Sequence, residues 1–114
     1  MKITNSKGKI ICKECKECKS IWSKGRGLMF TKKIKPLIME FKKEQKVSLH
    51  MGFVFYPIDV IYLNDKFKVV ELKERFKPFT IYNPKNKAKY IMELEEGKIQ
   101  KNKIKVGDTF IKTS

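Results

Sequence analysis

Short runs of β-branched and aromatic residues, separated by turn-forming residues, constrain the fold of this chain more than any other feature. β-branched and aromatic side chains pack well on a pleated sheet, whereas Asn, Asp, Ser and Gly favour turns. The longest run, Val47–Tyr56, ends at Pro57, and a proline there marks a bend or a sheet edge. Further strands are expected at Leu37–Phe41, Ile58–Leu63, Phe67–Leu72, Thr80–Tyr82, Ala88–Leu94 and Thr109–Lys112.

The chain is expected to open with a hairpin, in which Asn5-Ser6-Lys7-Gly8 forms the turn between Lys2–Thr4 and Lys9–Cys12. About seven or eight short strands with turn signals between them predict an all-β fold, a small β sandwich or closed barrel. Glu95–Lys103 is polar enough for one short helix or a loop. Two further turns are expected, at Asn64-Asp65-Lys66 and Gly107-Asp108.

The length of 114 residues suits a single β domain spanning residues 1–114, with the hairpin and a run of cysteines in residues 1–17. No stretch approaches the roughly 20 apolar residues that a bilayer-spanning helix needs. The N-terminal segment also lacks the apolar region of a secretory signal. Closely spaced cysteines suit a reducing compartment. We therefore expect a cytoplasmic protein that does not enter a membrane.

The charge of the chain is strongly positive, with a formal net charge of +15. Lysine and arginine supply the phosphate attraction of nucleic-acid-binding proteins. However, Arg26 and Arg75 are the only arginines among the 27 basic residues, and the lysines are spread along the whole sequence. We interpret this basic protein as one with a solvated lysine surface. Association with nucleic acid through that surface is the alternative.

Several motifs, taken in order along residues 18–112, carry a resemblance to a known family. They are Arg26–Phe30, His50-Met51 with Phe53, Pro57–Leu63, Val69-Val70, Glu93-Leu94 with Gly97, and Gly107-Asp108. On these motifs the chain resembles domain-of-unknown-function family 192, in its archaeal style. The resemblance implies a compact β fold. It implies no activity, because the family is uncharacterised, and the cysteine run is not part of its pattern.

Cys12, Cys15 and Cys18 form the run Cys-x-x-Cys-x-x-Cys. Thiolates at this spacing can share a soft metal, and His50 would complete a tetrahedral zinc site. On a β-strand, however, Cys15 would face away from the other two cysteines, so that chelation requires a turn. We favour three small, partly exposed thiols, and zinc bound by Cys12, Cys15 and Cys18 is the alternative.

Asp59 stands inside the apolar run Ile58–Leu63. In a strand it shares a face with Ile61 and Leu63, while Val60 and Tyr62 point the other way. A carboxylate in such surroundings needs a cation or hydrogen-bond donors, and Arg26 is the natural candidate. We favour a structural tie between Asp59 and the bend at Arg26. A polar ligand pocket around Asp59 is the alternative.

The only histidine, His50, lies among apolar residues, as a semi-buried structural histidine would. Glu93 either joins Asp59 in one cavity or faces solvent from its strand. No nucleophile elbow, phosphate-binding loop or zinc-protease motif is present, so the motifs favour binding over catalysis. An enzyme that uses His50 with a carboxylate is a further alternative. The resulting hypothesis is a non-catalytic module that binds a small molecule or an oligosaccharide through Arg26, His50, Asp59 and Glu93.

Overall fold

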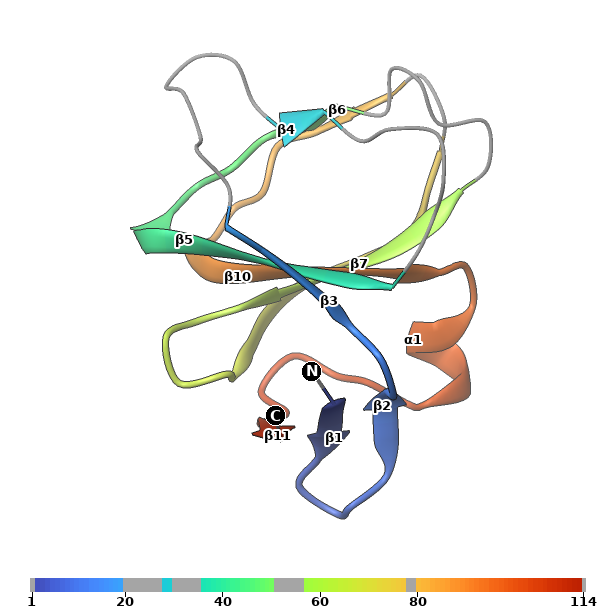
Figure 1. The fold of residues 1–114 in the computed structure, drawn as a ribbon. Helices are drawn as coiled ribbons and strands as arrows, with labels where there is room; N and C mark the ends of the chain where they lie inside the picture. The colour runs from blue at the N-terminus through green and yellow to red at the C-terminus, as the bar shows by residue number, and fades with distance from the viewer. Residues whose placement is uncertain (1, 20–27, 30–35, 51–56, 78–79, 114) are drawn as a thin grey trace.

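The computed structural model describes residues 2–19, 28–29, 36–50, 57–77 and 80–113. For residues 16–19, 28–29 and 50 it describes the backbone alone. Three sheets make up this part of the chain, and Figure 1 shows the central one with a smaller sheet on either side. The all-β fold class predicted from the sequence is therefore confirmed.

The central sheet has five strands in the order β3-β5-β10-β7-β8. β3 runs parallel to β5, and every other neighbouring pair is antiparallel. β7 and β10 are inner strands, each paired with a neighbour on both of its edges. The strands are β3 (Lys16–Lys19), β5 (Leu37–Gln45), β7 (Ile58–Leu63), β8 (Val69–Phe76) and β10 (Ala88–Glu95).

The two smaller sheets have three strands each, in the orders β11-β1-β2 and β4-β6-β9. We call them the lower and upper sheets, after their places in Figure 1. β1 pairs with β11 from Lys2↔Thr113 onward, so the two ends of the chain lie side by side. The lower sheet consists of β1 (Lys2–Asn5), β2 (Ile10–Cys12) and β11 (Phe110–Thr113), and the upper of β4 (Leu28–Met29), β6 (Leu49–His50) and β9 (Ile81–Tyr82).

Eleven strands are thus described, more than the seven or eight expected, because several are too short to stand out in the sequence. The expected helix is present as one turn, α1 (Lys98–Lys101). Of the expected strand Val47–Tyr56, β6 forms one part, and residues 51–56 lie outside the described residues. No helix in the described ranges has the length and apolar character needed to cross a bilayer.

Two of the predicted turns are confirmed, and each is held by an asparagine side chain. The Asn5 carboxamide oxygen accepts hydrogen bonds from the backbone N–H groups of Lys7 (2.9 Å) and Lys9 (2.8 Å). The Asn64 oxygen does the same for Lys66 (2.9 Å) and Lys68 (3.0 Å). Such local bonds are the reason asparagine favours turns.

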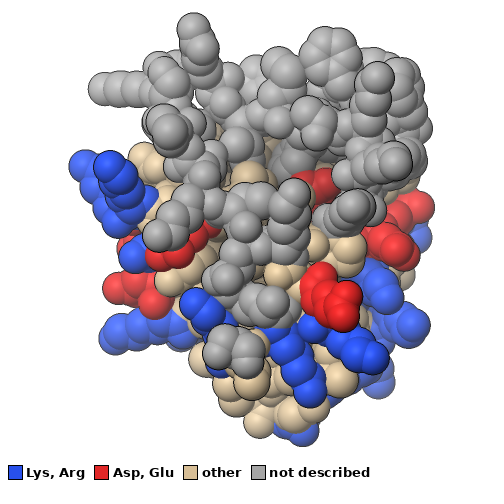
Figure 2. All heavy atoms as spheres, viewed as in Figure 1, with Lys and Arg blue, Asp and Glu red and all other residues tan. Residues whose placement is uncertain are grey.

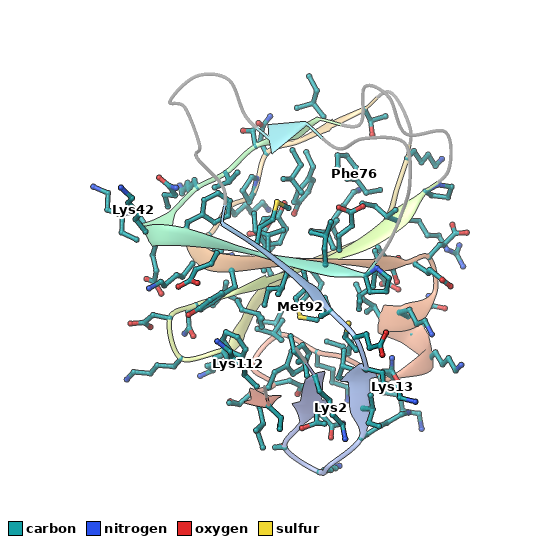
Figure 3. All side chains as sticks on the ribbon, in the orientation of Figure 1. Lys2, Lys13, Lys42, Phe76, Met92 and Lys112 are labelled. Atoms are coloured by element: carbon teal, nitrogen blue, oxygen red, sulfur yellow. The ribbon has the colours of Figure 1, made fainter. Side chains whose placement is uncertain are left out.

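The central sheet separates two apolar cores. The lower core contains Ile61, Leu63, Met92 and Leu94 from the central sheet, together with residues of β1, β2 and β11. The upper core contains Ile58, Val60, Tyr62, Phe76 and Ile91, together with Leu49 of β6. Figure 3 shows the labelled Phe76 above the central sheet and Met92 below it.

Every residue of β7 is buried, because one face of the strand packs into each core. The predicted alternation is confirmed: Val60 and Tyr62 lie in the upper core, opposite Ile61 and Leu63. The central sheet therefore presents two separate, covered surfaces on which buried polar groups have to find partners.

Candidate functional site

Glu93 is a buried carboxyl on the upper face of the central sheet. It is paired with Val60 on one side and Leu37 on the other, and both of these pack in or against the upper core. Its side chain is only 1% exposed, and its Oε2 atom has no hydrogen-bond partner among the described residues. Burial raises the pKa of Glu93 to about 8. The carboxyl is therefore mostly protonated at neutral pH.

Tyr62 is the second polar group on this face without a partner. The residue is fully buried, and its hydroxyl group forms no hydrogen bond with any described residue. Burial, followed by the nearby Tyr82 and Glu71, raises the pKa of Tyr62 well above its usual value. Its hydroxyl therefore stays protonated and can both donate and accept a hydrogen bond.

Glu71 shows what a satisfied buried carboxylate looks like in the same protein. Its oxygens accept hydrogen bonds from the backbone N–H groups of Lys85 (2.9 Å) and Asn86 (2.9 Å), and from the Tyr82 hydroxyl. Burial and this bond raise the pKa of Tyr82 to about 12. Glu71 therefore anchors the segment that follows β9, whereas Glu93 has no such role among the described contacts.

Asp59 lies on the opposite, lower face and is fully buried. Its Oδ1 atom accepts a hydrogen bond from the backbone N–H of Arg75 (3.0 Å). Its Oδ2 atom accepts two more, from Gly97 and Ile99 (3.0 Å each), which cap the first turn of α1. The structure thus provides donors for Asp59 from the backbone, and the partner expected from the sequence, Arg26, lies outside the described residues.

The four ligand-binding residues predicted from the sequence are therefore not all brought together. Asp59 and Glu93 point to opposite faces of the central sheet and do not share a cavity. His50 lies in β6, where its backbone pairs with Met29 and Ile81, and its side chain is outside the described part. Glu93 is also not a solvent-facing residue, which was the other interpretation of its position.

The cysteines differ from the partly exposed thiols that we favoured. Cys12 and Cys15 are only 4% and 2% exposed and pack in the lower core. A hydrogen bond from Cys15 lowers the pKa of Cys12, against the effect of burial. The Cys18 side chain lies outside the described residues, among which no three metal-binding side chains come together. Zinc binding by the run remains a prediction.

Cavities open on the outside of the described part of the molecule, among them the following two. One, of about 330 Å³, lies between the first turn and the segment after α1, but the Asn5 and Asp108 side chains in its wall already hold turns. The other, of about 290 Å³, is lined by basic residues of β8 and by Phe76 and Tyr82. The second has two aromatic residues, Phe76 and Tyr82, beside its cations.

Sequence reasoning missed Tyr62 and Glu71 as polar groups of interest. The signal for Tyr62 was present, because alternation in Ile58–Leu63 placed it on the face opposite Asp59, where a hydroxyl needs its own partner. The signal for Glu71 was absent, since its donors, Lys85 and Asn86, come from a distant segment.

The comparison with known families shows which family the chain belongs to. The model of domain-of-unknown-function family 192, described as "Uncharacterized ACR", matches residues 2–111. The chain belongs to this family. The match extends further toward the N-terminus than residues 18–112, where the motifs lie.

The chain is similar to UPF0127 proteins in sequence and to two solved structures in fold. The chain is 38% identical to a UPF0127 protein of Pyrococcus furiosus over 90% of each chain. A structure of a protein of unknown function from Novosphingobium aromaticivorans matches with a TM-score of 0.75 and 17% identity, covering 97% of this chain and 82% of that one. A Sinorhizobium meliloti protein, described provisionally as a transcription regulator, matches with a TM-score of 0.74 and 15% identity, covering 96% and 89%. The two structural likenesses support the fold alone.

Proposed function

We propose that this family member is a non-catalytic binding module whose site lies on the upper face of the central sheet, around Glu93 and Tyr62. The observation that carries the proposal is the Oε2 atom of Glu93, which is buried and has no partner among the described residues. An unsatisfied buried polar atom costs about 1–3 kcal/mol, so native proteins keep few of them. A ligand that supplies the missing hydrogen bond would explain its presence.

The chemistry of this face favours a neutral ligand rich in hydroxyl groups, such as a monosaccharide or a short oligosaccharide. A protonated carboxyl and a phenol each donate and accept hydrogen bonds, as sugar hydroxyls require. The surrounding side chains, Val60, Ile91 and Phe76, are apolar and are buried in the upper core.

Arg26 and His50 belong to this proposal through their place in the chain. β4, which begins two residues after Arg26, pairs with β6, which ends at His50. Both strands belong to the upper sheet, which covers the face that carries Glu93. Asp59 has no part in this proposed site, because its oxygens accept hydrogen bonds from backbone groups on the opposite face.

A binding experiment with defined sugars tests the proposal. Melting temperatures are measured with glucose, N-acetylglucosamine, maltotriose and cellotriose, for the unchanged protein, Glu93→Leu and the control Glu95→Gln on the exposed end of β10. A ligand of the native state raises the melting temperature by mass action. We expect one of these sugars to do so, with at least tenfold weaker binding to Glu93→Leu and unchanged binding to Glu95→Gln.

Two results would overturn this function. One is a Glu93→Leu variant that binds the sugar as tightly as the unchanged protein. The other is a native mass spectrum of the bare protein, from material purified under reducing conditions at high salt, together with no effect of any of the four sugars.

Association with nucleic acid is the second candidate function. The net charge of +15 supports it. Figure 2 shows basic side chains on both flanks and along the lower part of one face, with acidic side chains between them. This function predicts affinity for a labelled single-stranded oligonucleotide that falls steeply between about 50 and 300 mM salt. Affinity that does not change with salt would exclude it.

A further inference from the structure

We infer that the basic cavity beside β8 is a binding site for one nucleoside monophosphate unit, either free or within a single strand. Lys73, Arg75 and Lys77 line it together with Thr80, Phe76 and Tyr82. Its volume of about 290 Å³ is near the lower end of the roughly 300–1,000 Å³ typical of ligand sites, which suits one nucleotide. The inference deepens the second candidate function and rests on it, and neither Glu93 nor Tyr62 lines this cavity.

A bulge in β8 aims the central cation of this cavity. Ile58 pairs with Phe76, and Val60 pairs with Lys73. Between these two pairs β8 advances by three residues while β7 advances by two, which is the pattern of a bulge. Arg75, at the bulge, has a φ angle of 50°, in the left-handed region that residues other than glycine rarely adopt. Bulges of this kind redirect side chains and are frequent beside functional sites.

Buried Asp59 holds Arg75 in this strained conformation. Its Oδ1 atom accepts the Arg75 backbone N–H at 3.0 Å, while its other oxygen is fixed by the start of α1. The cost of such a conformation, about 1–3 kcal/mol, persists only where the surroundings enforce it. Asp59 is therefore a positioning residue for Arg75, which gives the fully buried carboxylate a function without ligand contact.

The guanidinium of Arg75 is available to an anion. Its side chain is 64% exposed, and its closest described acid is Glu96, with the ion-pair atoms 3.9 Å apart. Pairs this exposed contribute at most about 1 kcal/mol, so a phosphate can replace Glu96. A guanidinium binds phosphate through two parallel hydrogen bonds, and Lys77 adds a second charge at the same rim.

The aromatic wall of the cavity is rigid before any ligand arrives. The Tyr82 hydroxyl donates to Glu71, and its ring packs against Phe76 and Tyr62 with centroid distances of 6.2 and 6.0 Å. The Lys73 ammonium lies 5.3 Å from the Tyr82 ring centroid. A cation and a fixed ring at one cavity suit a phosphate joined to a planar base, since bases stack on aromatic side chains in single-strand sites.

The test compares four probes, AMP, adenosine, inorganic phosphate and an eight-nucleotide single-stranded poly(dA), by titration calorimetry. The unchanged protein is expected to bind AMP at least tenfold more tightly than adenosine or phosphate alone. Binding of AMP but no tighter binding of poly(dA) assigns the site to free nucleotides. Tighter binding of poly(dA), with a steep salt dependence, assigns it to a strand.

Arg75→Gly is the decisive variant, because it removes the guanidinium and also relieves the strained φ angle. We expect it to melt at the same temperature as the unchanged protein or higher, while binding AMP at least tenfold more weakly. Lys42→Gln removes a charge from the exposed part of β5, away from Phe76 in Figure 3, and should leave AMP binding unchanged.

Two outcomes would overturn the inference: no binding of AMP or poly(dA), or equal weakening of binding by Lys42→Gln and Arg75→Gly. The second outcome would still be consistent with diffuse attraction of nucleic acid by the lysine surface. Failure of this site can therefore be distinguished from failure of the second candidate function. Asp59→Asn should weaken AMP binding with unchanged affinity for sugars, as expected for a residue that acts through Arg75.

Discussion

Asp59 and Glu93 are both buried carboxyl groups of the central sheet, but they differ in their hydrogen-bond partners. Asp59 accepts hydrogen bonds from three backbone N–H groups, so that both of its oxygens have partners. Glu93 has an unpartnered oxygen, and burial instead favours its neutral form, with a pKa of about 8. The difference identifies Glu93, and not Asp59, as the carboxyl with capacity left for a ligand.

The raised pKa of Glu93 predicts that stability falls as pH rises. In the unfolded chain the group ionises near its ordinary value of 4.5, whereas in the native protein it keeps its proton up to about pH 8. The native state therefore binds the extra proton between these values. The free energy of unfolding should decrease by up to about 1.4 kcal/mol per pH unit in this window, and level off above it.

Urea denaturation at pH 5, 6.5 and 8.5 measures this effect, with Glu93→Gln as the comparison. The carboxamide that this variant carries does not titrate, so the difference in unfolding free energy between the two proteins should shift in favour of the variant as pH rises. A difference that is constant over the three pH values would show that Glu93 is ionised in the native state.

Tyr62→Phe is expected to leave the protein as stable as before, or to stabilise it by up to about 1 kcal/mol. The hydroxyl has no partner among the described residues, so its removal loses no described hydrogen bond and ends a desolvation cost. The proposed sugar site should nevertheless bind more weakly. Thermal melting with and without sugar measures both effects, and a loss of more than about 2 kcal/mol of stability would reveal a structural partner for the hydroxyl.

At the scale of elements, Asp59 joins strand β7 to two neighbours that are distant in sequence. One oxygen fixes the bulge of β8 and the other fixes the start of α1, where Gly97 has a φ angle of 94°. The N-cap residue of this one-turn helix is Gly97, which has no side chain that could form a capping hydrogen bond. A carboxylate from β7 therefore provides the cap that α1 lacks.

Removal of the Asp59 carboxylate, which links β7 to β8 and α1, is expected to cause a large loss of stability. Asp59→Ala leaves three backbone N–H groups in or near the core without an acceptor, at a cost of about 3–5 kcal/mol. Asp65→Ala, at an exposed turn, is the control and should cost less than about 1 kcal/mol. Urea denaturation distinguishes the two, and a loss below about 1 kcal/mol for Asp59→Ala would contradict the assigned role.

At the scale of the whole molecule, the central sheet is shared by both apolar cores, while each small sheet covers one of them. Opening of a small sheet exposes one core, but separation of β7 from β10 requires both to open. Hydrogen exchange should therefore be slowest in Ile58–Leu63 and Ala88–Glu95 and faster in β11. Native-state exchange followed by mass spectrometry checks this order, and equal protection of β11 would indicate a single cooperative unit.

The sequence predicted those parts of the fold that depend on hydrogen bonds or side-chain alternation within a few residues. Asn5 and Asn64 bond to backbone groups within four residues, so their turns were evident. Alternation in Ile58–Leu63 correctly placed Asp59 opposite Tyr62. The short strands of the upper sheet were less visible, because a two-residue strand has no period that a sequence can display.

The all-β class, the residues of β7 that share a face, and the family resemblance all follow from the sequence. The partners of the buried polar groups follow from the tertiary structure. The donors to Asp59 lie 16, 38 and 40 residues away in the sequence, and the bulge that aims Arg75 depends on the pairing of β7 with β8. Hydrogen-bond partners across a sheet depend on register and on packed neighbours, and neither is encoded in the local pattern around a single residue.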